Sequence, residues 1–270
     1  MCIFSEKQAK VFKKVAFFGA LCYNGERKTQ GRREKMDRYF VLLGGGELKT
    51  KQTLALDRVI GELAKQRAGD RRANALFVGT ASHDLMPYYN TFHKTYTGEL
   101  DIKTDVALTV FTEMNAEKLD AKFARADLIY VGGGDTVFML DAWRKSGLGE
   151  RILDAYRRGV IVAGLSAGAI CWFEKMYTDS APGADGKAPY AVFPALGILK
   201  GGACPHYDDR RADFAENVPE GEKWLCIENA AAAVYRNETL VGILENGKNA
   251  YTVCKNGGKV TETPIPVWEE

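Results

Sequence analysis

Apolar and polar residues alternate in two ways along the chain from residue 38 onward. Short runs rich in apolar residues, most of them ended by glycine, are typical of strands buried in a parallel sheet. They predict strands at 39–43, 75–78, 103–108, 128–131 and 160–163. Between them, apolar residues at helical spacing predict helices over 53–67, 88–97, 137–144 and 148–158. This alternation predicts an α/β fold with a mostly parallel sheet flanked by helices.

The pattern changes in the C-terminal third. Residues 178–190 are rich in Gly, Pro, Asp and Ala, which predicts a surface loop. Beyond it, short apolar runs separated by turn signals predict extra strands at 197–199, 224–227, 231–235, 239–241 and 250–253. Neither an internal repeat nor a linker divides the chain after residue 36, so we expect one domain over 37–270.

The first 36 residues differ from the rest in charge. They carry nine Lys and Arg against three Glu, whereas the whole chain has a formal net charge of +2, so the body is mildly acidic. The apolar run 15–22 resembles a signal-peptide core, but no small-residue cleavage site follows it and it is too short to span a membrane. We expect residues 1–36 to be a basic, poorly ordered extension, with Met36 as a candidate physiological start.

Composition narrows the class of protein further. A chain with 46% hydrophobic and 27% charged residues is ordinary for a soluble globular protein, and an acidic body argues against a nucleic-acid surface. The six Cys form no C-x-x-C pair and the three His show no ligand spacing with them, which favours free thiols in a reducing compartment. We therefore expect a cytoplasmic protein with no cofactor, no metal and no membrane or nucleic-acid partner. A homodimer is one alternative for its assembly.

The first candidate catalytic residue is Ser166. Gly164-Leu165-Ser166-Ala167-Gly168 fits the pattern G-x-S-x-G and stands between an apolar strand and a predicted helix. In that context the glycines permit a tight turn that raises the serine hydroxyl above the sheet edge, and the free N–H groups of the following helix point at any oxyanion that forms. The pattern predicts a nucleophile; the alternative is a plain glycine-rich turn.

A serine nucleophile needs a base, and His206 is the best candidate. It lies in the segment 201–210, which Gly and Pro mark as a loop after the predicted strand 197–199. His83 and His93 lie in or near the predicted helix 88–97, where surface histidines are expected.

A carboxylate is expected to orient the imidazole of the base and to stabilise its cation. Asp208 and Asp209 follow His206 closely, and Glu228 ends the apolar run 225–227. Spacing alone does not separate these three acids.

Two glycine runs also end predicted strands. Gly132-Gly133-Gly134 precedes Asp135 and leaves N–H groups free to bind an anion, so it is either half of an oxyanion hole or a tight turn. Gly44-Gly45-Gly46 lacks the G-x-G-x-x-G spacing because position 49 is Lys, which argues against a dinucleotide site.

Three blocks together resemble the peptidase E family of aspartyl dipeptidases, which also includes cyanophycinase-like enzymes. The blocks are Tyr130–Thr136, Gly164–Ala169 and Cys204–Tyr207, and the resemblance covers roughly residues 38–255. It implies a fold similar to class I glutamine amidotransferases, with serine in place of their cysteine. It further implies Ser166 as nucleophile, His206 as general base and Glu228 as the third member, with the N–H groups of Gly134 and Ala167 as the oxyanion hole.

The chain departs from that family at two places. Asp135 stands where the family usually has Asn, and its charge is expected to oppose a developing oxyanion unless it is paired or turned away. At the offset where the aspartyl dipeptidase holds its substrate carboxylate with a basic residue, this chain has Glu220. Arg210 and Arg211 come sooner and, with Asp135, are the candidate substrate-binding residues.

The sequence thus predicts a serine peptidase that hydrolyses a dipeptide or other short peptide, with an acidic N-terminal residue, through an acyl-enzyme on Ser166. One alternative is a related amide hydrolase acting on branched or β-aspartyl peptides. The other is a non-catalytic small-molecule-binding protein on the same fold.

Overall fold

The computed structural model describes residues 36–110, 115–180, 190–244 and 246–269. The larger of its two sheets has seven strands in the order β11-β10-β1-β5-β4-β2-β3. Strands β1, β5, β4, β2 and β3 are parallel, and β10 and β11 complete the sheet as antiparallel strands. The bounds are β1 Tyr39–Leu43, β2 Asn74–Val78, β3 Lys103–Ala107, β4 Leu128–Val131, β5 Ile161–Leu165, β10 Ala232–Arg236 and β11 Thr239–Leu244.

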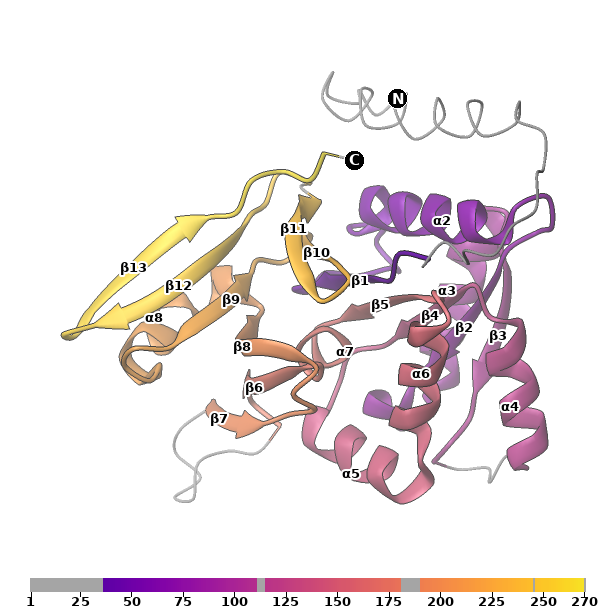
Figure 1. The fold of residues 1–270 in the computed structure, drawn as a ribbon, viewed down its shortest axis with the longest axis horizontal. Coiled ribbons are helices and arrows are strands. Elements are labelled where there is room, and N and C mark those ends of the chain that lie inside the picture. The colour runs from indigo at the N-terminus through magenta and orange to yellow at the C-terminus, as the bar shows by residue number, and fades with distance from the viewer. Residues whose placement is uncertain (1–35, 111–114, 181–189, 245, 270) are drawn as a thin grey trace, which may run out of the picture.

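Helices cover both faces of this sheet (Figure 1). Alternate residues of each strand point to opposite faces, so in β1 Phe40 and Leu42 enter one core while Val41 and Leu43 enter the other. The second core is closed by α2 and α3, and the first by α4, α5, α6 and the short α7. The bounds are α2 Leu54–Ala68, α3 Met86–Gly98, α4 Ala116–Arg125, α5 Thr136–Ser146, α6 Leu148–Arg157 and α7 Ala167–Ile170.

The smaller sheet has six strands in the order β13-β12-β9-β8-β6-β7, with β6, β8 and β9 parallel and the others antiparallel. Helix α8 connects β8 to β9, and the β12–β13 hairpin extends away from the rest of the molecule (Figure 1). The bounds are β6 Phe173–Thr178, β7 Ala191–Pro194, β8 Leu199–Pro205, α8 Tyr207–Asn217, β9 Lys223–Ile227, β12 Ala250–Asn256 and β13 Lys259–Pro264.

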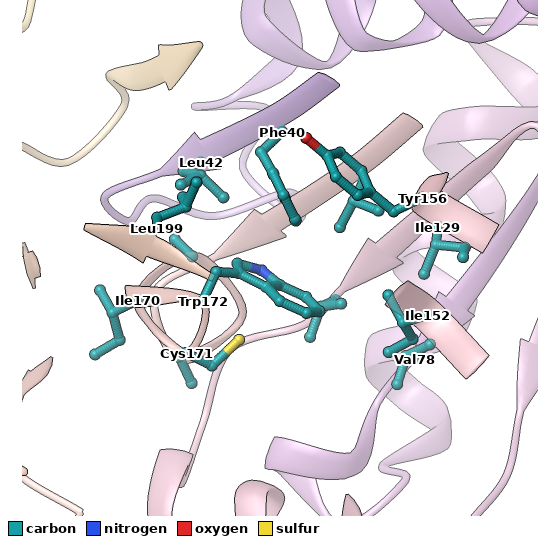
Figure 2. Packing of buried hydrophobic residues seen from close by; sticks show 14 of the residues in the cluster. Phe40, Leu42, Val78, Ile129, Ile152, Tyr156, Ile170, Cys171, Trp172 and Leu199 are labelled. Atoms are coloured by element: carbon teal, nitrogen blue, oxygen red, sulfur yellow. The ribbon is translucent and has the colours of Figure 1, made fainter. Parts of the chain in front are cut away.

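The two sheets share one core, centred on Trp172. Its ring lies 5.1 Å from that of Phe40 in β1, and Leu199 of β8 belongs to the same buried cluster (Figure 2). The indole N–H donates to the carbonyl of Gly168 at 2.9 Å, which fixes the ring against the turn that follows β5. The smaller sheet is therefore held directly beside the carboxyl end of β5.

The predicted fold class is confirmed: an α/β protein with a mostly parallel sheet, flanking helices and extra strands in the C-terminal third. The prediction of a loop over 201–210 is wrong, because β8 runs to Pro205 and α8 begins at Tyr207. Gly202 is a glycine because the Trp224 ring occupies the place of a side chain, and no turn is formed there. The predicted extension over residues 1–36 lies, except for Met36, outside the described residues, and the limits of the single domain stay a prediction.

Across the described ranges, no helix is both long enough and apolar enough to cross a membrane.

Candidate active site

Ser166 occupies a sharp turn between β5 and α7. Its backbone has φ 53° and ψ −109°, a region that non-glycine residues rarely adopt, and its N–H donates to the Leu43 carbonyl at 2.9 Å. A side chain at Gly164 would collide with the Gly168 carbonyl, and one at Gly168 would collide with the Val131 carbonyl. The glycines of G-x-S-x-G therefore allow strand and helix to approach closely enough to present the serine at the sheet edge.

His206 reaches Ser166 from the other sheet. It lies between the end of β8 and the start of α8, also with a positive φ of 147°. Its Nε2 is 2.6 Å from Ser166 Oγ, a short hydrogen bond. Residues 40 positions apart thus form the pair that sequence reasoning expected between a nucleophile and its base.

The second nitrogen of the imidazole contacts Asn229. His206 Nδ1 lies 2.9 Å from Asn229 Oδ1, while Asn229 Nδ2 donates to Asp208 Oδ1 at 2.9 Å and to Asp209 Oδ2 at 2.8 Å. Because both carboxylates need a donor, the amide NH₂ faces them and the amide oxygen faces His206. Nδ1 therefore carries the proton, and Nε2 is free to accept from the serine hydroxyl.

This arrangement contradicts the expectation that Glu228 orients His206. The Glu228 carboxylate accepts from the Asn249 N–H at 2.9 Å and pairs with Arg211 at 3.2 Å. The first residue after β9, Glu228, faces Asn249 and Arg211, and the next, Asn229, faces His206. Glu228 thus connects the end of β9 to Asn249 and Arg211. The partner of His206 is Asn229, which the sequence analysis did not predict.

Asp208 and Asp209 contact the amide of Asn229, not the imidazole. Asp208 also accepts from the Asn229 backbone N–H at 3.0 Å and from Lys248 at 2.9 Å. Burial alone raises the pKa of Asp208, but these donors stabilise the carboxylate and hold its pKa below the usual value. The ionised Asp208 fixes the orientation of the Asn229 side chain.

Burial lowers the pKa of His206 below its usual value, and the Arg210 charge adds to that effect. The hydrogen bond that His206 Nδ1 donates to Asn229 and the charges of Asp179 and Asp209 act in the opposite direction. The net shift keeps the imidazole neutral at neutral pH, the state in which it accepts a proton.

The glycine run before Asp135 faces Ser166. A side chain at Gly133 would lie within 3.3 Å of Ser166 Cβ, and Gly134 is exposed with φ 138°. The Gly133 N–H donates to the Tyr88 hydroxyl at 3.3 Å. Among the backbone hydrogen bonds that the described residues form outside helices and strands, none uses the N–H of Gly134 or of Ala167. Their role as an oxyanion hole stays a prediction.

A cleft of about 460 Å³ opens beside this group. Its lining residues are Gly134, Asp135, Ser166, Asp179, Ser180, His206 and Arg210. Asp135 Oδ1 accepts a hydrogen bond from the Phe138 N–H at 2.9 Å and so caps α5. This bond stabilises part of the Asp135 negative charge, which was expected to oppose an oxyanion.

The two arginines proposed for substrate lie in different places. Arg210 lines the cleft, whereas Arg211 is stacked near Tyr207 and Tyr251 and pairs with Glu228 and Glu262. The expectation that Arg211 binds substrate is therefore not met by its position. Glu220 lies on the β12–β13 side, where it accepts from the Gly258 N–H at 2.8 Å.

Gly45 belongs to this site although its glycine run was considered only as a nucleotide loop. A side chain there would collide with both His206 Nδ1 and Asn229 Oδ1. The run of three glycines at the end of a central strand was the available signal, and the structure gives its reason. The backbone must pass directly beside the imidazole and the amide.

Comparison with known proteins decides the family. The model of peptidase family S51 matches residues 40–243, which include Ser166, His206 and Asn229. The chain belongs to peptidase family S51. The resemblance to peptidase E is thereby confirmed, and membership in this family supports peptidase activity.

Two similar proteins are also described as peptidases. The chain is 33% identical over 241 residues to the uncharacterized peptidase YgaJ of Bacillus subtilis (strain 168), covering 86% of this chain and 98% of that protein. It is 28% identical to the uncharacterized peptidase Lin0382 of Listeria innocua, over 53% of this chain and 71% of that protein.

Two solved structures share the fold. One is a peptidase from an acI-B1 Actinobacterium, with a TM-score of 0.67 and 17% identity over 87% of this chain and 96% of that one. The other is a candidate peptidase E protein of Listeria monocytogenes EGD-e, with a TM-score of 0.57 and 18% identity over 78% of this chain and 100% of that one.

Proposed function

We propose that this S51 peptidase is a serine peptidase that hydrolyses a dipeptide or other short peptide through an acyl-enzyme on Ser166. The observation that carries the proposal is the 2.6 Å hydrogen bond between Ser166 Oγ and His206 Nε2 at the mouth of the cleft. A cleft of about 460 Å³ is at the small end of ligand sites, which suits a short peptide better than a folded protein.

In the first half of the reaction, Ser166 Oγ attacks the peptide carbonyl carbon while its proton passes to His206 Nε2. The Asn229 oxygen accepts a hydrogen bond from His206 Nδ1–H throughout, so it holds the imidazole in place and stabilises its positive charge. His206 then gives the proton to the leaving amine. In the second half, water attacks the ester and the same proton path runs again.

The oxygen of the tetrahedral intermediate would be held by the N–H groups of Gly134 and Ala167. Removing one such donor costs roughly 3–4 kcal/mol of transition-state stabilisation in enzymes of this type. The neutral ground state of His206 supports its role as base, because a protonated imidazole could not accept the serine proton.

Labelling with a fluorophosphonate probe tests the proposal. We expect one adduct, located by peptide mass spectrometry on Ser166, and loss of both labelling and dipeptide hydrolysis in Ser166→Ala with an unchanged melting temperature. Ser180→Ala is the matched control, because Ser180 lines the same cleft but lies outside the pair with His206. Hydrolysis retained by Ser166→Ala would overturn the assignment.

The resemblance to peptidase E also implies an acidic N-terminal residue in the substrate, and the charges that line the cleft argue against that implication. A cytoplasmic location, expected from the cysteines, and a homodimer stay predictions.

A further inference from the structure

Among the described residues, the charged side chains that line the cleft are two carboxylates and one guanidinium: Asp135, Asp179 and Arg210. We propose, on the basis of the function proposed above, that Asp135 binds a positively charged group of the substrate. The site would then take peptides with a free α-ammonium group and a neutral or basic N-terminal side chain, in preference to an acidic one.

Arg210 is already engaged by the protein. Its side chain is only 7% exposed, pairs with Asp179 at 3.4 Å and donates to the Tyr177 carbonyl at 3.3 Å. The guanidinium also lies 4.6 Å from the centre of the Tyr190 ring. An acidic substrate side chain would have to compete with the Asp179 carboxylate for a cation that is largely out of reach of solvent, which makes Arg210 a poor anchor for aspartate.

Asp135 is in the opposite condition. Its Oδ1 caps α5 through the Phe138 N–H, and no ion pair among the described residues includes its carboxylate. The side chain is partly exposed and lines the cleft, and its second oxygen has no hydrogen-bond donor in the described part of the chain. A carboxylate that forms no ion pair with the described residues and caps a helix with only one of its oxygens attracts cations and repels anions.

The position of Asp135 connects this charge to the scissile bond. It directly follows Gly134, whose N–H is the proposed donor to the substrate carbonyl oxygen. The group attached next to that carbonyl is the α-carbon of the N-terminal residue, which carries the ammonium group and the side chain. A carboxylate one residue beyond the oxyanion donor is therefore placed to meet the charge of the acyl part of the substrate.

Asp135→Asn separates the charge of this residue from its structural role. Asn caps a helix about as well as Asp and has nearly the same shape, so α5 and the Gly134 loop should keep their geometry. Asp141→Asn, on the same helix but exposed and paired with Lys145, is the matched control for removing one negative charge.

The assay compares kcat/KM for Lys-Ala, Ala-Ala and Asp-Ala with that for their N-acetylated forms. The wild type should prefer Lys-Ala and Ala-Ala over Asp-Ala, and free amines over acetylated ones. In Asp135→Asn the ratio of free to acetylated Ala-Ala should fall by about 10- to 100-fold, the loss of one hydrogen bond between charged groups. Most of the change should appear in KM, and Asp141→Asn should keep the wild-type ratio.

A wild-type preference for Asp-Ala, or a ratio that Asp135→Asn leaves unchanged, would overturn the inference while leaving the serine mechanism intact. Failure of the proposed function looks different: none of the peptides would be cleaved, and the fluorophosphonate would not label Ser166 in either protein.

Discussion

Asn229→Ala is the most direct test of the site geometry. The substitution removes the oxygen that lies 2.9 Å from His206 Nδ1 and leaves the 2.6 Å contact between His206 and Ser166 without a second support. It also removes the donor that separates the imidazole from Asp208 and Asp209. The serine and the base both remain, so any loss of activity measures the orienting role of the amide.

The magnitude follows from the bond that is lost. A hydrogen bond to a group that becomes charged contributes about 1.5–3 kcal/mol, and each 1.4 kcal/mol is a factor of ten in rate. We therefore expect kcat/KM to fall by about 10- to 150-fold. Because the Asn229 hydrogen bond raises the pKa of His206, its loss should also move the acid limb of the kcat/KM profile to lower pH.

The assay is the pH dependence of kcat/KM on one cleaved dipeptide, with Glu228→Gln as control. Glu228 precedes Asn229 and carries the charge that a sequence motif favours, but its carboxylate binds Asn249 and Arg211. We expect Glu228→Gln to stay within about fivefold of wild type, since a partly exposed ion pair contributes at most about 1 kcal/mol. The reasoning is refuted if Glu228→Gln loses activity and Asn229→Ala keeps it.

Three further outcomes follow from the structure. Gly45→Ala should abolish most activity, because its methyl group would separate His206 from Asn229, whereas Gly98→Ala, with open space around it, should be neutral; steady-state kinetics compares the two. Since burial lowers the pKa of His206, the decline of kcat/KM on the acid side should be centred below the ordinary histidine pKa of 6.5, and a decline centred above pH 6.5 would contradict this. Burial raises the pKa of Asp57 to about 7, so the fold binds a proton that the unfolded chain has released, and stability should fall as pH rises. Urea unfolding at pH 5 and pH 8 should show a loss of about 3 kcal/mol that Asp57→Asn lacks.

The parallel sheet and the serine turn were predictable because their signals are local. Strand runs such as 39–43 are apolar throughout, and G-x-S-x-G encodes a turn within five residues. The second sheet was harder to predict, because Gly202 indicates a loop in isolation and is explained only by the Trp224 ring that packs on it from the adjacent strand.

The partner of His206 could not be predicted for a related reason. The register of β8 and β9 pairs Pro205 with Ile227. His206 follows Pro205, and Glu228 and Asn229 follow Ile227, so the register brings both of these residues close to His206. A shift of one residue decides whether Glu228 or Asn229 faces the imidazole, and the sequence does not determine that shift. The negative charge of Glu228 made it the expected partner of His206, but the turn after β9 places the Asn229 amide there.

The separation of Ser166 and His206 onto different sheets has a consequence for a truncated chain. The imidazole follows the serine by 40 residues, and its amide support follows by 23 more. Under the proposed mechanism, a chain that ends after α7 has the serine but neither the base nor the amide that orients it. We therefore expect such a fragment to have no peptidase activity.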